Sequence, residues 1–165
     1  MRSEPDGRLA RLRKSTTPAT RHPMIPSSHQ GRFVGPNRLW LMPGTPVNVS
    51  DGSLELTADR VQIRWAYEGA AKEGEIVLSG PASSCRGSFK DTFHAPDGMV
   101  FHGAVSGREL RLYGTFPVGD GSPEWGWRIT LDWADPEHVT LRMFNVKPDG
   151  EEALAVDLRG SRASA

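Results

Sequence analysis

Apolar and polar residues alternate along residues 124–133 in a pattern that predicts a half-buried β-strand. Trp125, Trp127, Ile129, Leu131 and Trp133 fall on one face, whereas Gly126, Arg128, Thr130 and Asp132 fall on the other. Only a pleated backbone sends alternate side chains to opposite faces. Three tryptophans on one face need a large apolar space to fill, which favours the interior of a barrel.

Segments of this kind recur from Phe33 onward at a spacing of roughly 12 residues, which is typical of an antiparallel all-β domain. Asp-Gly pairs, which tolerate positive φ, lie in several of the intervening turns. We expect strands near residues 37–42, 53–58, 60–68, 73–80, 84–94, 99–105, 109–116, 124–133, 138–146 and 152–160. The sequence therefore predicts an all-β fold, a closed antiparallel up-and-down barrel of about ten strands that leaves no exposed edge.

The alternation also predicts which side chains point inward. The inward faces comprise Val61, Ile63, Trp65 and Tyr67; Leu110, Leu112 and Phe116; and Val139, Leu141, Met143 and Asn145. Barrels of about eight strands already enclose a lumen that side chains fill or share with a small ligand. With ten strands we expect an internal cavity.

Residues 1–30 form a basic segment ahead of the barrel domain, which we place at residues 31–165. The segment carries six Lys or Arg side chains against two acids and has almost no apolar periodicity. Such a composition cannot bury enough surface to offset the cost of chain ordering, so we interpret it as a disordered tail. Two alternatives stay open: a basic arm that touches phosphate or membrane, and a true start at Met24.

Charge and cysteine content restrict the partners and the compartment. The barrel domain has 14 basic against 18 acidic side chains, once the tail's six and two are taken from the totals of 20 each. A mildly acidic body lacks the basic stripe that nucleic acid requires. Cys85 is the single cysteine, so we expect a reducing, cytoplasmic setting. The chain lacks the apolar runs of a membrane span or a signal peptide. We expect no membrane partner and a monomer or homodimer.

The hairpin around residues 95–98 contains the best candidates for chemistry, and its loop length decides which residues meet. A four-residue loop pairs His94 with Met99 and Asp91 with His102. A three-residue loop instead places both histidines on one face. We prefer the four-residue register because it keeps the polar residues of the strand near residues 84–94 in water.

In the preferred register, Asp91 and His102 form a carboxylate–imidazole pair inside the barrel. Burial disfavours either charge alone, so such a pair can hold a proton or orient a tautomer. This suits general acid–base catalysis or polar recognition of a ligand. A structural hydrogen bond between two buried polar groups is the alternative interpretation.

Other inward residues would line a pocket. We assign this role to Trp65, Tyr67, Phe89, Trp127 and Met143, with Asn145 helping to fix the orientation of a ligand. Arg128 faces outward by parity, but a bulge at Gly126 would turn it inward, where its guanidinium could bind a carboxylate. Histidine and cysteine spacing does not favour zinc. We expect neither a metal nor a cofactor; a metal site and a haem held by one of the histidines are the alternatives.

Several motifs resemble a known family. They are Gly35-Pro36-Asn37-Arg38-Leu39-Trp40-Leu41, Trp65-Ala66-Tyr67-Glu68-Gly69, Asp91-Thr92-Phe93-His94, Trp125-Gly126-Trp127-Arg128 and Leu154-Ala155-Val156. Together they resemble the small bacterial proteins of domain-of-unknown-function family 1579, which have calycin-like (lipocalin-like) β-barrels. The resemblance covers residues 33–160. It implies a barrel with an internal pocket and brings no established reaction.

Three functions fit these observations. The leading hypothesis is binding of a small, mostly apolar or amphipathic molecule inside the barrel. The second is an isomerase, cyclase or hydrolase that uses Asp91 and His102 as an acid–base pair. The third is a barrel that serves only as an interaction module. The same aromatic residues could also simply fill the interior.

Overall fold

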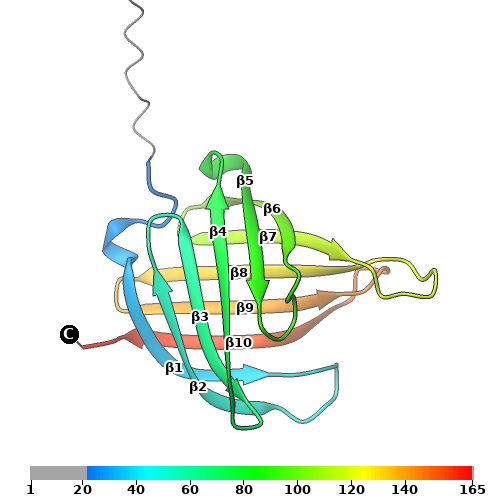
Figure 1. The fold of residues 1–165 in the computed structure, drawn as a ribbon. Coiled ribbons are helices and arrows are strands. Elements are labelled where there is room, and N and C mark those ends of the chain that lie inside the picture. Colours follow the sequence, from blue (N-terminus) through cyan, green and yellow to red (C-terminus); the bar gives the residue numbers. More distant parts are fainter. Residues whose placement is uncertain (1–21, 165) are drawn as a thin grey trace, which may run out of the picture.

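The computed structural model describes residues 22–164, which form a single closed barrel of ten antiparallel strands (Figure 1). The strands are β1 (Gly31–Leu39), β2 (Asn48–Leu56), β3 (Arg60–Tyr67), β4 (Ala70–Ser79), β5 (Cys85–Asp91), β6 (Met99–Ser106), β7 (Glu109–Phe116), β8 (Trp125–Asp135), β9 (His138–Val146) and β10 (Glu152–Arg162). Short 3-10 helices occur at Ser27–His29 (η1) and Ala82–Ser84 (η2). Every strand pairs with its sequence neighbours, and β1 pairs with β10 to close the barrel. The predicted all-β, up-and-down barrel is confirmed.

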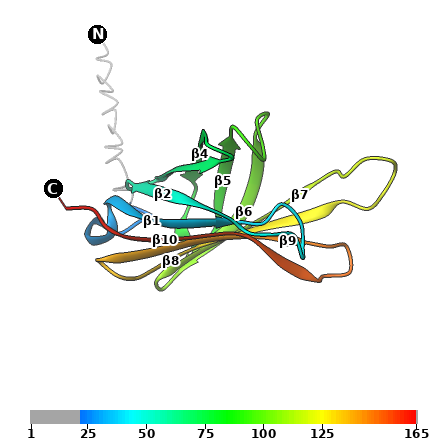
Figure 2. The same cartoon turned by 90° about the horizontal axis from the view of Figure 1, so that it is seen from below.

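The strands of the barrel run in two main directions (Figure 1). Strands β3, β4 and β5 cross β8, β9 and β10 at a steep angle (Figure 1). In the second view, β4 and β5 rise from the flat layer that β8, β9 and β10 form (Figure 2). Strands β1 and β6 curve between the two groups. Side chains from both groups therefore meet in one enclosed core.

Glycine allows the close backbone approaches at which the barrel turns. A Cβ on Gly35 of β1 would lie 1.9 Å from the carbonyl oxygen of Arg159, and one on Gly103 of β6 would lie 1.8 Å from that of Arg111. No other residue fits at such distances, which is why glycine within a strand marks a sharp bend or a close contact.

The predicted inward faces of β3, β7, β8 and β9 are confirmed. The predicted inward residues that are buried in one continuous core are Val61, Ile63 and Trp65 of β3, Leu110 and Leu112 of β7, Trp127, Ile129, Leu131 and Trp133 of β8, and Val139, Leu141 and Met143 of β9. Tyr113 and Arg111 lie exposed on the outer face, as the parity of β7 predicts. Because the side-chain period of a strand is two, a few apolar residues determine the orientation of the whole strand.

The end of the barrel near the N-terminus is covered by residues that we assigned to the tail. Ile25 is fully buried in the core, and its backbone N–H donates a hydrogen bond to the carbonyl of Ala58 (N···O 3.0 Å). The side-chain amide of Gln30 donates to the carbonyl of Ile25. The packed body therefore begins before residue 31. The prediction of disorder for residues 1–21 lies outside the described residues.

The predicted register between β5 and β6 is wrong. The observed pairing joins Phe89 with Met99 and Arg86 with His102, so the connection between the strands is longer than either predicted loop. Phe101 therefore points inward and is fully buried, while His102 lies exposed on the outer face. Arg86, Ser88 and Lys90 of β5 stay exposed in this register as well, and burial of the Phe101 ring adds a gain of about 1.5–3 kcal/mol. The proposed Asp91–His102 pair does not form.

This register can be tested by paired substitutions. Phe101→Ala should lower the free energy of unfolding by about 3–5 kcal/mol, because it removes a fully buried ring and leaves a cavity. Val100→Ala, at the neighbouring exposed position, should change it by less than about 1 kcal/mol. Urea unfolding followed by tryptophan fluorescence measures both values. A larger effect at Val100 would contradict the observed register.

Candidate functional site

The buried Asp91 carboxylate forms an ion pair with an imidazole, but its partner is His94. Oδ2 of Asp91 lies 2.6 Å from Nδ1 of His94, in the connection between β5 and β6. Only 4% of Asp91 is exposed, and 17% of the His94 side chain. The carboxylate–imidazole pair that the sequence predicts therefore exists with a different histidine. It is formed within one loop and does not span two strands.

The same carboxylate also holds the backbone of the loop. Its Oδ1 accepts hydrogen bonds from the backbone N–H groups of Phe93 (3.1 Å), His94 and Ala95 (2.7 Å). The Asp91 N–H in turn donates to the carbonyl of Ala95. An Asx-type turn of this kind satisfies three donors with one side chain. The loop geometry therefore places His94 in a defined position above the interior.

The pKa of Asp91 is lowered. Burial alone would raise it, but the hydrogen bond and charge of His94 and the N–H groups of Ala95 and Phe93 outweigh burial and favour the ionised form. Because the carboxylate is ionised, Nδ1 of His94 must carry the proton that lies between them. The other ring nitrogen, Nε2, is left as an acceptor when the imidazole is neutral.

The His94 ring packs between two tryptophans from different strands. Its centroid lies 6.1 Å from that of Trp65 on β3 and 5.1 Å from that of Trp127 on β8. Phe93 packs edge-on against His94 at 4.7 Å and also contacts Tyr67 at 4.9 Å. An aromatic cluster therefore surrounds the imidazole at one end of the barrel.

Both tryptophans carry an unsatisfied donor. Trp65 and Trp127 are 8% and 7% exposed, and within residues 22–164 no protein group accepts a hydrogen bond from either indole N–H. A buried donor without an acceptor costs roughly 1–3 kcal/mol. Buried polar groups in native proteins nearly always have a partner. Both N–H groups belong to rings that contact His94, and each can donate to a water molecule or another acceptor.

The space beside His94 is small. Its lining comprises Asn37, Leu39, Ile63, Trp65, Asp91, His94, Met143 and Val156, and its volume is about 10 Å³. A space of this size holds about one water molecule. The internal cavity that we expected from the number of strands is reduced to this space beside His94, because aromatic side chains such as Trp133, Phe33 and Phe89 fill the interior.

The other predicted pocket residues lie at different distances from the cavity. Met143 lines the small cavity, and Tyr67 belongs to the aromatic cluster at its edge. Asn145 is half-buried on β9, directly opposite Trp127 on β8. Phe89 instead packs against Phe101 in the core, with ring centroids 6.0 Å apart, and does not line the cavity.

Arg128 lies on the outer face of β8, as parity predicts, and the alternative of a bulge that turns it inward is wrong. Its Nε donates to Oε1 of Glu152 at 2.8 Å, and its guanidinium carbon lies 4.0 Å from the centroid of the Phe144 ring. Gly126 keeps the regular register and lies beneath the ring of Tyr113. Arg128 therefore takes no part in the interior site.

Two polar residues of the site, Asn37 and His94, were not predicted from the sequence. Asn37 is only 2% exposed and lines the cavity from β1. We placed the start of this strand at residue 37, but it begins at Gly31 and continues through Pro36. The alternation of Phe33, Asn37 and Leu39 would have placed Asn37 inside. No spacing rule would have selected His94, because its position depends on the turn that Asp91 makes.

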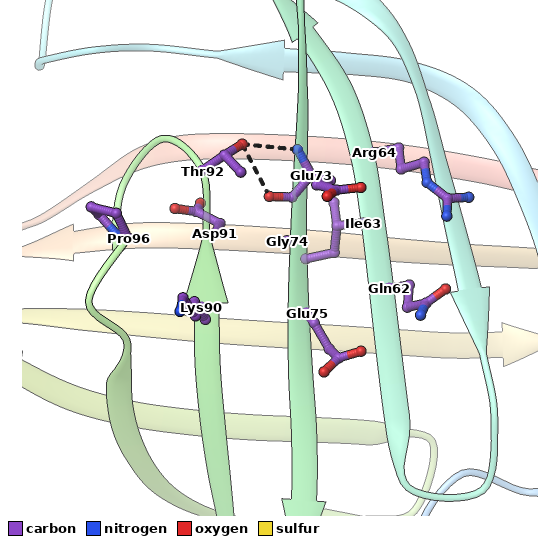
Figure 3. A pocket seen from close by; sticks show the side chains of 10 residues that line it. All are labelled: Gln62, Ile63, Arg64, Glu73, Gly74, Glu75, Lys90, Asp91, Thr92 and Pro96. Atoms are coloured by element: carbon purple, nitrogen blue, oxygen red, sulfur yellow. Dashed lines mark hydrogen bonds between the residues drawn. The ribbon is translucent and has the colours of Figure 1, made fainter.

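A separate groove of about 390 Å³ lies on the outer side of β3, β4 and β5 (Figure 3). Ile63 and Asp91 line both this groove and the interior cavity, so the two spaces lie on opposite sides of the same part of the sheet. The Thr92 hydroxyl bonds to the backbone of Glu73 beside it (Figure 3). The groove carries charges of both signs and therefore favours no single class of ligand.

Comparisons with known proteins do not identify a family. No protein-family model matches the chain, and no curated protein matches it. The resemblance to domain-of-unknown-function family 1579 stays a prediction. Between residues 22 and 164, no group of three or more His, Cys, Asp or Glu side chains is arranged to hold a metal ion. The same part of the chain has no helix long and apolar enough to span a membrane.

The contribution of Asp91 to stability should depend on pH. Asp91→Ala should lower the free energy of unfolding at pH 7 by about 3 kcal/mol, because three backbone N–H groups and the imidazole lose their acceptor. Since the pKa is lower in the folded state, this contribution is complete above about pH 4 and is lost as the pH falls through the folded-state value. Urea unfolding at a series of pH values should show that the free energies of unfolding of wild type and Asp91→Ala become more similar as the pH falls.

Asp97→Ala is the matched control, because Asp97 is an exposed aspartate in the same loop. It should change stability by less than about 0.5 kcal/mol at any pH. Equal effects of the two substitutions would show that the carboxylate of Asp91 does not hold the loop.

Proposed function

We propose that the protein binds a small, mostly apolar molecule in the barrel, at the end covered by residues 92–98. The observation that carries this proposal is the position of His94 between two buried indole rings whose N–H groups have no protein acceptor within residues 22–164. Aromatic walls with a few convergent polar groups are the usual design of small-molecule sites. Packing alone would not require unsatisfied donors at this point.

Binding requires the loop to move, because the cavity holds only about 10 Å³. Strand pairing between β5 and β6 ends at Phe89 and Met99, so the intervening residues are outside the ladder of these two strands. Displacing His94 therefore breaks the bonds to Asp91 and leaves the barrel intact. The space then opened would lie between Trp65 and Trp127, with Tyr67 at its edge. Loop displacement of this kind is a common way to admit a ligand.

We also propose a cytoplasmic setting. Cys85, the only cysteine of the chain, is a free thiol and is 2% exposed in the core. Its pKa is raised, chiefly by burial, which keeps it in the unreactive thiol form. A protein with no disulfide is suited to a reducing compartment.

The binding proposal can be tested with N-phenyl-1-naphthylamine, a neutral apolar probe whose emission rises on burial. We expect a saturable rise in probe emission together with quenching of tryptophan fluorescence. Asp91→Ala should increase the association rate constant several-fold, because the loop is no longer held closed. Stopped-flow fluorescence measures the rate.

Leu41→Ser with Met42→Ser is the control for this experiment, because these side chains are 51% and 63% exposed on the β1–β2 loop. The double variant should bind the probe as wild type does. Loss of binding in this variant would locate the probe on the surface, and no binding by any variant would contradict an interior site.

A second candidate function is favoured by the Asp91–His94 pair. An imidazole held at Nδ1 by a carboxylate presents Nε2 as a general base, and neighbouring N–H donors can stabilise developing negative charge. This arrangement supports proton transfer to or from a bound molecule, as in an isomerase, cyclase or hydrolase. Here His94 takes the role that we had assigned to His102.

Hydrolysis of p-nitrophenyl acetate tests the hydrolase version of this candidate. His94→Gln should reduce the rate above background by about 10²-fold or more, because the general base is lost. His102→Gln is the matched control, since His102 lies exposed on the outer face, and its rate should equal that of wild type. Equal loss in both variants, or none in His94→Gln, would rule out the pair as a catalytic base for this ester.

A further inference from the structure

The two unpaired indole N–H groups and the His94 imidazole restrict which polar group a ligand can place beside them. An indole N–H can only donate. Trp65 lines the cavity, Trp127 does not, and both rings that carry an unpaired N–H contact the same His94 ring. A ligand group that satisfies them must accept hydrogen bonds.

The charges around this position disfavour a ligand group that carries a permanent negative charge. The cavity lining contains the ionised Asp91 carboxylate and neither lysine nor arginine. His94 is the one lining residue that can become a cation, and its Nδ1 is already committed to Asp91. A second negative charge would therefore face Asp91 across a space of low dielectric with no cation left to neutralise it.

Lys72 places a cation beside the aromatic cluster. Its Nζ lies 5.7 Å from the centroid of the Phe93 ring, and Lys72 does not line the cavity. It can attract a charged group to the rim of the site. It does not change the charge balance beside the two indoles.

We infer that the ligand presents a neutral hydrogen-bond acceptor, such as the carbonyl oxygen of a ketone, ester or amide, to the indole N–H groups of Trp65 and Trp127. This inference rests on the proposed function and adds the chemical class of the ligand. His94 Nε2 then faces the atoms next to the carbonyl. The apolar remainder of the ligand lies against the aromatic rings that surround His94.

Three probes of similar shape test this inference on the full-length protein: acetophenone, ethylbenzene and benzoate. Acetophenone should bind about tenfold more tightly than ethylbenzene, which lacks the acceptor, and more tightly than the anionic benzoate. The five tryptophans give five indole N–H signals in a ¹H–¹⁵N correlation spectrum. Two of these, assigned through Trp65→Phe and Trp127→Phe, should move downfield on saturation with acetophenone.

Each of these two variants keeps an aromatic ring and loses one donor, so each should lose several-fold of the preference for acetophenone over ethylbenzene. Trp133→Phe is the matched control, because Trp133 is also buried (1% exposed) but contacts His29 at the other end of the barrel. It should retain the full preference.

The outcomes separate this inference from the proposed function. Equal binding of ethylbenzene and acetophenone would overturn the requirement for an acceptor while leaving the binding site intact. If benzoate bound most tightly, the inference that the acceptor is neutral would be overturned. Indole signals that stay fixed on saturation would show that a buried water satisfies both donors, which also overturns the inference. Failure of these probes and of N-phenyl-1-naphthylamine to bind would overturn the proposed function itself.

Discussion

The carboxylate of Asp91 accepts hydrogen bonds from three consecutive backbone N–H groups and from the His94 imidazole, and the rest of the site depends on this arrangement. Asp91 is the last residue of β5 and lies opposite Gly74 of β4. A Cβ added at Gly74 would lie 2.8 Å from the Cβ of Asp91. The missing side chain at Gly74 leaves room for the carboxylate to turn inward. A buried charge must be fully satisfied, so the loop and His94 behave as one unit.

The barrel is closed in different ways at its two ends. Ile25 and the residues after it cover one end, where an apolar side chain continues the core. The other end is covered by the loop that carries His94, and here the buried atoms include a carboxylate, an amide and two unpaired indole donors. At the end that Ile25 covers, one buried polar atom, Nε2 of His29 beside the Trp133 ring, also has no protein partner within residues 22–164. A polar closure over unsatisfied donors costs free energy, and a bound ligand would recover it.

The candidate site was only partly predictable. Trp65, Trp127 and Met143 were identified because the period of two in β3, β8 and β9 determines their inward direction. Asp91 was identified as a buried carboxylate with an imidazole partner, but the partner was wrong. Strand parity extends only as far as the ladder does, and β5 stops pairing with β6 at Phe89. Beyond that residue, contacts between the Asp91 side chain and the backbone determine the loop, and no periodic pattern encodes them.

By itself, the sequence determined the all-β class, the ten strands, their up-and-down order and the inward faces of β3, β7, β8 and β9. These properties follow from local alternation and from turn residues, which act over a few positions along the chain. Only the tertiary structure decided the register of β5 against β6, the burial of Phe101, the choice of His94 over His102 and the small size of the cavity. Each of these depends on how side chains from distant strands compete for one enclosed volume, and that competition is settled by packing and by the satisfaction of buried polar groups.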